Sequence, residues 1–176
     1  MKSCPEIPVK VLIAYEDFAT GQRAMKLCER LINNLGHDFQ FRTCFWKFDI
    51  LCLPKLKPIA SQDAFHADVV IISTYWRDDL PAQVKSWMTS WPGKAPRHPQ
   101  ALVGLLCGDS DQSQNDSPAR AFLEGFARNG RLAFFTQASA VPVAQAESFS
   151  DSGPTDRPTC SALEQILRAR KDPVWQ

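Results

Sequence analysis

Side chains that could bind a ligand gather in three short polar segments of the sequence. The first, residues 16–22, contains three residues that could offer a hydroxyl group and backbone N–H groups to a phosphate at a helix start: Thr20, Gly21 and Gln22. It also contains Glu16 and Asp17, and each carboxylate beside a phosphate costs roughly 1 kcal/mol at about 4 Å in water. The segment therefore has two interpretations, a phosphate-binding turn or a helix start capped by Asp17 or Thr20.

The second and third segments carry aromatic and small polar residues. Residues 75–80 begin with Tyr75, Trp76 and Arg77, and the candidate Thr74 ends the strand before them. The two aromatic side chains could stack on a planar ring and the guanidinium group could bind an anion, or the tryptophan could pack on the sheet and the arginine pair with a following aspartate. Residues 108–116 begin with Gly108, Asp109 and Ser110 and form either a loop that closes over a ligand or a solvated turn.

Cysteine and histidine give little support to nucleophilic or metal chemistry. The six cysteines include no C-x-x-C pair, and the three histidines are scattered. Cys107 precedes the third segment, but no histidine lies in the three segments to serve as its base. Residues 1–6 lack the apolar core of a signal peptide. We therefore expect reduced, mostly buried thiols in a cytoplasmic protein.

The elements that must position the three segments follow from hydrophobic patterning. Segments 9–15, 67–74 and 101–107 have continuous apolar cores, at 11–14 and 69–72 in the first two, and predict strands that are buried on both faces, as in a parallel sheet. Residues 39–46 alternate between apolar and polar, which predicts a less buried strand at the sheet edge. Residues 132–136 predict a fifth strand at the other edge.

Helical signals separate these strands. Apolar residues recur at spacings of three and four over 24–35, with Gly36 at the expected helix end. Asp79 as N-cap and Pro81 in the first turn predict the start of another helix, with an apolar stripe that continues to Trp91. Ser117 predicts a further helix start. A short helix is expected near residues 60–65.

This alternation predicts an α/β protein of three layers, with a doubly wound, five-stranded parallel sheet in the flavodoxin-like order 2-1-3-4-5. We expect the domain to span residues 1–137, followed by a proline- and serine-rich tail, 138–176, with a short C-terminal helix. In such a sheet, ligands bind at the carboxyl ends of the strands, at the switch point between the first and third strands. All three polar segments lie there.

Composition excludes several classes of function. The chain of 176 residues has 20 basic and 19 acidic residues, a net charge of +1, which argues against nucleic-acid binding. No apolar run approaches the roughly 18 residues of a membrane span. Trp87, Trp91 and the tail could serve a homodimer, although core packing explains the two tryptophans equally well.

Residues 67–74, followed by Leu-Pro-Ala-Gln-Val-Lys at 80–85, resemble NADPH-dependent FMN reductases of the flavodoxin-like superfamily. Residues 49–54, Lys94 and residues 101–108 extend the resemblance, which covers residues 9–137. It implies that FMN lies across the three polar segments and that NAD(P)H is a partner. The family pattern Pro-Glu-Tyr-Asn-Gly is replaced here by residues 74–78, so that Asp78 stands where a glycine lets the backbone approach the flavin.

Two functions remain open from the sequence. One is an FMN-binding NAD(P)H-dependent oxidoreductase, in which the flavin carries the hydride chemistry and no catalytic side chain is required. The other is a non-enzymatic ligand- or protein-binding module on the same fold, with a degenerate flavin site or a degenerate response-regulator receiver site. A working receiver is disfavoured because Ser73 or Thr74 stands at the position of the acceptor aspartate.

Overall fold

Five parallel strands form a single sheet in the order β2-β1-β3-β4-β5, which confirms the predicted topology. The structure is a computed structural model that describes residues 7–36, 39–76, 78–91, 100–108, 117–139 and 162–168. The strands are β1 (Ile7–Tyr15), β2 (Phe39–Lys47), β3 (Val69–Tyr75), β4 (Ala101–Cys107) and β5 (Ala133–Ser139).

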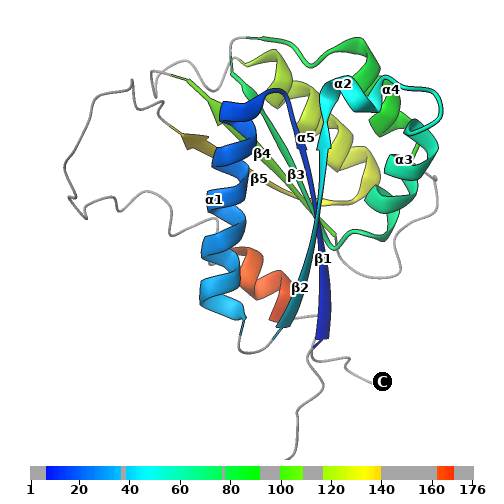
Figure 1. Ribbon diagram of the computed structural model, residues 1–176. Coiled ribbons are helices and arrows are strands. Elements are labelled where there is room, and N and C mark those ends of the chain that lie inside the picture. Colours follow the sequence, from blue (N-terminus) through cyan, green and yellow to red (C-terminus); the bar gives the residue numbers. More distant parts are fainter. Residues whose placement is uncertain are drawn as a thin grey trace, which may run out of the picture.

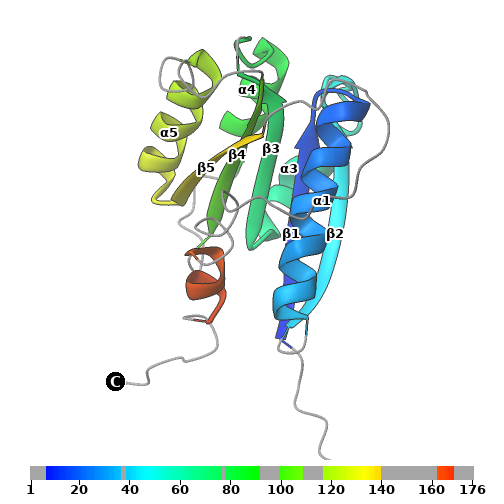
Figure 2. The same cartoon turned by 90° about the vertical axis from the view of Figure 1, so that its left-hand side faces the viewer.

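Helices cover both faces of the sheet and complete the three layers (Figure 1). They are α1 (Phe18–Leu35), α2 (Phe48–Leu51), α3 (Lys57–His66), α4 (Ala82–Thr89) and α5 (Pro118–Gly130). The apolar side of α1 and one face of the strands form one core cluster, and residues of α2 to α5 form a second cluster against the other face. Figure 2 shows α1 standing in front of β1 and β2.

Strand burial follows the sequence pattern. Every residue of β4 is buried, and so is every residue of β3 except the last, because helices pack on both faces of the central strands. β2 pairs with β1 alone and mixes buried, half-buried and exposed residues. The prediction that β2 is an edge strand is therefore confirmed.

The start of α4 differs from the prediction. The helix begins at Ala82 with Pro81 as its N-cap, and it ends at Thr89, before Trp91. The Asp79 side chain does not cap it, because one carboxylate oxygen accepts the neighbouring Leu80 N–H at 2.9 Å. The other oxygen accepts from Lys85 Nζ at 2.6 Å. The prediction of Asp79 as N-cap was wrong.

A further helical segment, residues 162–168, lies on the same side of the sheet as α1 (Figure 1). Leu163 and Leu167 are 0% and 2% exposed and belong to the same core cluster as the α1 face. Part of the segment that we predict as a tail therefore contributes to the core. No helix among the described residues is long and apolar enough to cross a membrane.

Candidate functional site

The carboxyl ends of β1, β3 and β4 bring the three polar segments together. The Glu16 N–H donates to Ser73 O at 3.1 Å, and the Trp76 N–H donates to Cys107 O at 3.1 Å. The chain leaves β1 toward α1 on one face and β3 toward α4 on the other, so the two crossovers diverge here. This is the switch point at which ligands of such sheets bind.

At the start of α1, Asp17 and Thr20 form a reciprocal capping box. The Thr20 N–H donates to Asp17 Oδ1 at 2.9 Å, and Thr20 Oγ1 accepts the Asp17 N–H at 2.9 Å. The fully buried Thr20 hydroxyl also accepts the Glu16 N–H at 3.2 Å and lies 2.9 Å from Asp17 O, to which it donates. The hydroxyl group that we predict for phosphate binding is thus used in capping the helix.

The two acidic residues also connect this turn to β3. Thr74 Oγ1 donates to Glu16 Oε2 at 2.6 Å, and the Tyr75 N–H donates to the same oxygen at 3.3 Å. The Tyr75 hydroxyl donates to Asp17 Oδ2 at 2.8 Å. Each carboxylate therefore joins two segments that lie far apart in the sequence.

Electrostatics keep Asp17 charged. Burial opposes its ionisation, but hydrogen bonds from Thr20 N–H, the Tyr75 hydroxyl and the Thr20 side chain outweigh that effect and hold the pKa of Asp17 below its usual value. The hydrogen bond to Asp17, followed by burial, raises the pKa of Tyr75. At neutral pH the pair is therefore a carboxylate and a neutral phenol.

Other residues of the predicted site occupy packed positions. A Cβ atom at Gly21 would lie 2.9 Å from the Tyr15 ring, and one at Gly108 would lie 1.6 Å from the Trp76 ring. Trp76 thus packs directly on Gly108, as the alternative of sheet packing predicts. The Gly21 N–H donates to Asp17 O at 2.9 Å, and Gln22 is exposed. Arg77, Asp109 and Ser110 lie outside the described residues.

These contacts decide how well a flavin phosphate fits. The start of α1 already holds a carboxylate that accepts the Thr20 N–H, and Glu16 adds a second negative charge beside it. The residues present therefore do not fit a phosphate at this position. The phosphate role of Thr20, Gly21 and Gln22 stays a prediction that this geometry disfavours.

Two described thiols, Cys28 and Cys44, have environments that keep them protonated. Burial, then the neighbouring Glu29, raises the pKa of Cys28 to about 11. Burial, then Asp63, raises the pKa of Cys44 to about 11, so both thiols stay protonated and inert at neutral pH. Among the described residues, no three His, Cys, Asp or Glu side chains cluster as metal ligands do.

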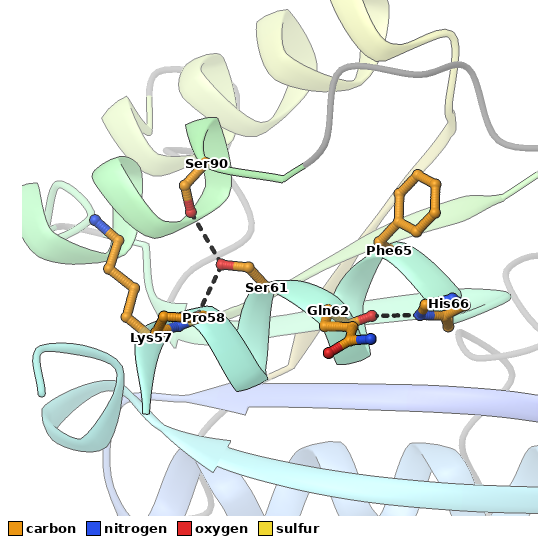
Figure 3. A pocket seen from close by; sticks show the side chains of 7 residues that line it. All are labelled: Lys57, Pro58, Ser61, Gln62, Phe65, His66 and Ser90. Carbon is orange, nitrogen blue, oxygen red and sulfur yellow. Dashed lines mark hydrogen bonds between the residues drawn. The ribbon is translucent and has the colours of Figure 1, made fainter. Parts of the chain in front are cut away.

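A second feature is a cavity of about 550 Å³ that is open to solvent, beside α3 and the end of α4 (Figure 3). Its lining residues are Lys57, Pro58, Ser61, Gln62, Phe65, His66 and Ser90. The spacing of 57, 61 and 65 places three of them on one face of α3. That spacing can be read from the sequence, but the packing of the end of α4 beside α3 cannot.

Comparison with known proteins gives structural likeness only. No family model and no curated protein matches the chain. A short-chain flavodoxin associated with a non-canonical PDU bacterial microcompartment superposes with a TM-score of 0.59 at 10% identity, covering 93% of this chain and 98% of that one. An oxidoreductase from Corynebacterium diphtheriae gives a TM-score of 0.58 at 12% identity, covering 93% of each chain.

The observed architecture agrees with these superpositions in its strand order, its parallel pairing and its helices on both faces of the sheet. At such identities the likeness concerns the fold and leaves the ligand open. The chain has the flavodoxin-like fold.

Proposed function

We propose that this chain is a non-enzymatic binding module on the flavodoxin-like fold, in which the switch point does not hold a flavin phosphate. The observation that carries the proposal is the Asp17 carboxylate, which occupies the helix start with one oxygen on Thr20 N–H and the other on the Tyr75 hydroxyl. Phosphate-binding helix starts offer free N–H groups and a favourable dipole to an incoming anion. Here an internal anion takes that place.

The energy of this arrangement disfavours a second anion. A unit charge at about 4 Å from a carboxylate is repelled by about 1 kcal/mol in water and by about 4 kcal/mol at the effective dielectric near a protein surface. Glu16 adds to the repulsion, and its Oε2 is held by Thr74 and by the Tyr75 N–H. Moving either carboxylate away would also break hydrogen bonds that hold the turn against β3.

Flavin titration tests the proposal. We expect the purified protein to be colourless and to leave the fluorescence of added FMN unquenched. Riboflavin, which lacks the phosphate of FMN, is titrated in the same way as the matched control ligand. Asp17→Asn removes the negative charge but keeps a side-chain oxygen that accepts the Thr20 N–H. This variant therefore separates charge repulsion of the phosphate from a change in the shape of the site. A wild-type protein that purifies with stoichiometric FMN would overturn the proposal.

The second candidate is an FMN-binding NAD(P)H-dependent oxidoreductase, and one observation favours it. Tyr75 ends β3 and Trp76 follows it, packed against Gly108, and these two aromatic side chains could stack on a planar ring. One solved structure of similar fold is an oxidoreductase. A flavin would supply hydride transfer, while this chain would orient its ring. With this candidate function we also propose that NAD(P)H is a partner, that two copies of the chain form a homodimer and that the protein is cytoplasmic. FMN-dependent oxidation of NADPH by the purified protein would support it.

A further inference from the structure

The cavity beside α3 is lined by other residues than those of the switch point. α3 runs from Lys57 to His66, and β3 begins three residues later at Val69. His66 is therefore near the amino end of the sheet, whereas Lys57, at the other end of α3, is nearer the carboxyl end. None of the residues that line the cavity belongs to the three polar segments. Its volume of about 550 Å³ falls within the roughly 300–1,000 Å³ of small-molecule sites.

The charge of the described lining is positive. Lys57 Nζ donates to Ser86 Oγ at 2.8 Å, a neutral partner, and the described lining residues include no Asp or Glu. Two other lysines differ, because Lys47 lies 2.7 Å from Asp49 and Lys85 lies 2.6 Å from Asp79. The ammonium group of Lys57 is thus available to an incoming anion.

A pair of serine hydroxyls beside Lys57 has more hydrogen-bond contacts than protons. Ser61 Oγ lies 2.9 Å from Lys57 O and 2.9 Å from Ser90 Oγ (Figure 3). Ser90 Oγ also lies 2.6 Å from Trp87 O. Two hydroxyl protons cannot fill three contacts. The oxygens of the pair therefore keep lone pairs that can accept a hydrogen bond from a ligand hydroxyl.

Another part of the cavity is lined by the Phe65 ring and carries a second acceptor. Phe65 lies one helical turn beyond Ser61, and its ring meets the His66 ring edge-on at 5.3 Å. His66 Nδ1 lies 2.8 Å from Gln62 O, and because a carbonyl oxygen only accepts, Nδ1 carries the proton. In the neutral ring, Nε2 is then an acceptor.

We propose that the cavity between α3 and α4 binds a small organic anion with a flat apolar body and a hydroxyl group, such as a hydroxylated aromatic carboxylate. Lys57 binds the carboxylate, the Ser61–Ser90 pair accepts a hydrogen bond from the hydroxyl group, and Pro58 and Phe65 contact the ring. This inference names a ligand class for the binding module and in that sense rests on the proposed function. It places the ligand on residues that do not belong to the switch point.

The test uses 4-hydroxybenzoate as the probe and follows amide resonances of the full chain by NMR, with affinity measured by calorimetry. We expect saturable shifts concentrated in residues 57–66 and 86–90. Lys57→Gln weakens binding about tenfold, because a charge-assisted hydrogen bond is lost. Lys57→Arg retains most of the affinity. Lys85→Gln is the matched control and leaves it unchanged, because Lys85 is paired with Asp79 outside the lining.

Two related probes resolve the polar contacts. Benzoate lacks the hydroxyl group and binds several-fold more weakly than 4-hydroxybenzoate, and Ser61→Ala abolishes that difference. Phenol lacks the carboxylate and shows no response to Lys57→Gln. Thermal unfolding of each variant shows that the fold is retained. Absence of saturable binding, shifts elsewhere in the chain, or equal effects of Lys57→Gln and Lys85→Gln would overturn the inference.

Failure of this inference differs from failure of the proposed function. A protein that binds FMN at the switch point contradicts the proposed function through its flavin spectrum, whatever the probe does. A colourless protein that ignores 4-hydroxybenzoate contradicts only the ligand class and place inferred for the cavity.

Discussion

The Asp17 carboxylate is hydrogen-bonded on both oxygens, one to its own helix and one to a neighbouring strand. The first bond is local and caps α1, and the second reaches 58 residues along the chain to Tyr75. One side chain therefore stabilises the helix start, ties it to β3 and sets the negative charge of the switch point.

A charge of this kind makes stability depend on pH. The pKa of Asp17 is lower in the folded protein than its ordinary value of 3.8, so its contribution is present above that value and is lost as the pH falls through the folded pKa. Asp17→Ala should lower the free energy of unfolding by about 0.5–2 kcal/mol at pH 7. Urea unfolding should show this difference shrinking below about pH 4.

Asp17→Asn serves as the control for that experiment, because it keeps a side-chain oxygen for the Thr20 N–H but carries no charge. It should lose less stability than Asp17→Ala at pH 7. An identical Asp17→Ala effect at pH 7 and in strong acid would contradict the role assigned to the carboxylate charge.

Two glycines show how the same substitution has opposite effects in different elements. Gly108 follows β4 and lies against Trp76, with 1.6 Å between a built Cβ atom and the indole ring. Gly125 lies within α5, and a Cβ atom there meets nothing within 4 Å. Neither glycine has a positive φ, so contact rather than backbone strain decides the outcome.

Gly108→Ala should therefore displace the Trp76 ring and cost about 1–3 kcal/mol of stability. Gly125→Ala should stabilise the protein by about 0.4–1 kcal/mol, because it reduces the freedom of the unfolded chain. Urea unfolding measures both, and tryptophan fluorescence reports the displaced ring. If Gly108→Ala left stability and fluorescence unchanged, the packing of Trp76 on Gly108 would be disproved.

At the scale of the whole molecule, residues 162–168 raise the question of where the domain ends. We predict a domain that ends at residue 137, followed by a tail, yet Leu163 and Leu167 pack into the core cluster on the α1 side. The connection that precedes this segment lies outside the described residues. The domain boundary stays a prediction.

Leu163→Ala tests whether this segment belongs to the cooperative unit. Leu163 is 0% exposed, so the change should cost about 2–5 kcal/mol and shift the whole unfolding transition. Gln165→Ala, on the exposed side of the same helical turn, is the control and should have little effect. A separate early transition in Leu163→Ala would show that the segment unfolds independently of the sheet.

Local sequence patterns were sufficient to predict most of the helices and strands. The runs of β3 and β4, the alternation of β2 and the stripe of α1 were predicted because strand and helix burial repeat with fixed periods. The start of α4 was predicted wrongly because Asp79 has a partner, Lys85, that competes with its capping role. The choice between a phosphate turn and an Asp17 cap stayed open because both interpretations share the same residues.

The sequence by itself determined the alternation of strands and helices and the edge position of β2, and it left the place of a ligand site as a prediction. Only the tertiary structure decided that Glu16 and Asp17 bond to Thr74 and Tyr75, and that α3 and the end of α4 line an open cavity. Periodicity is a local property that a sequence displays directly. Hydrogen bonds and cavities between distant segments depend on how the packed layers place side chains, and no local pattern records that placement.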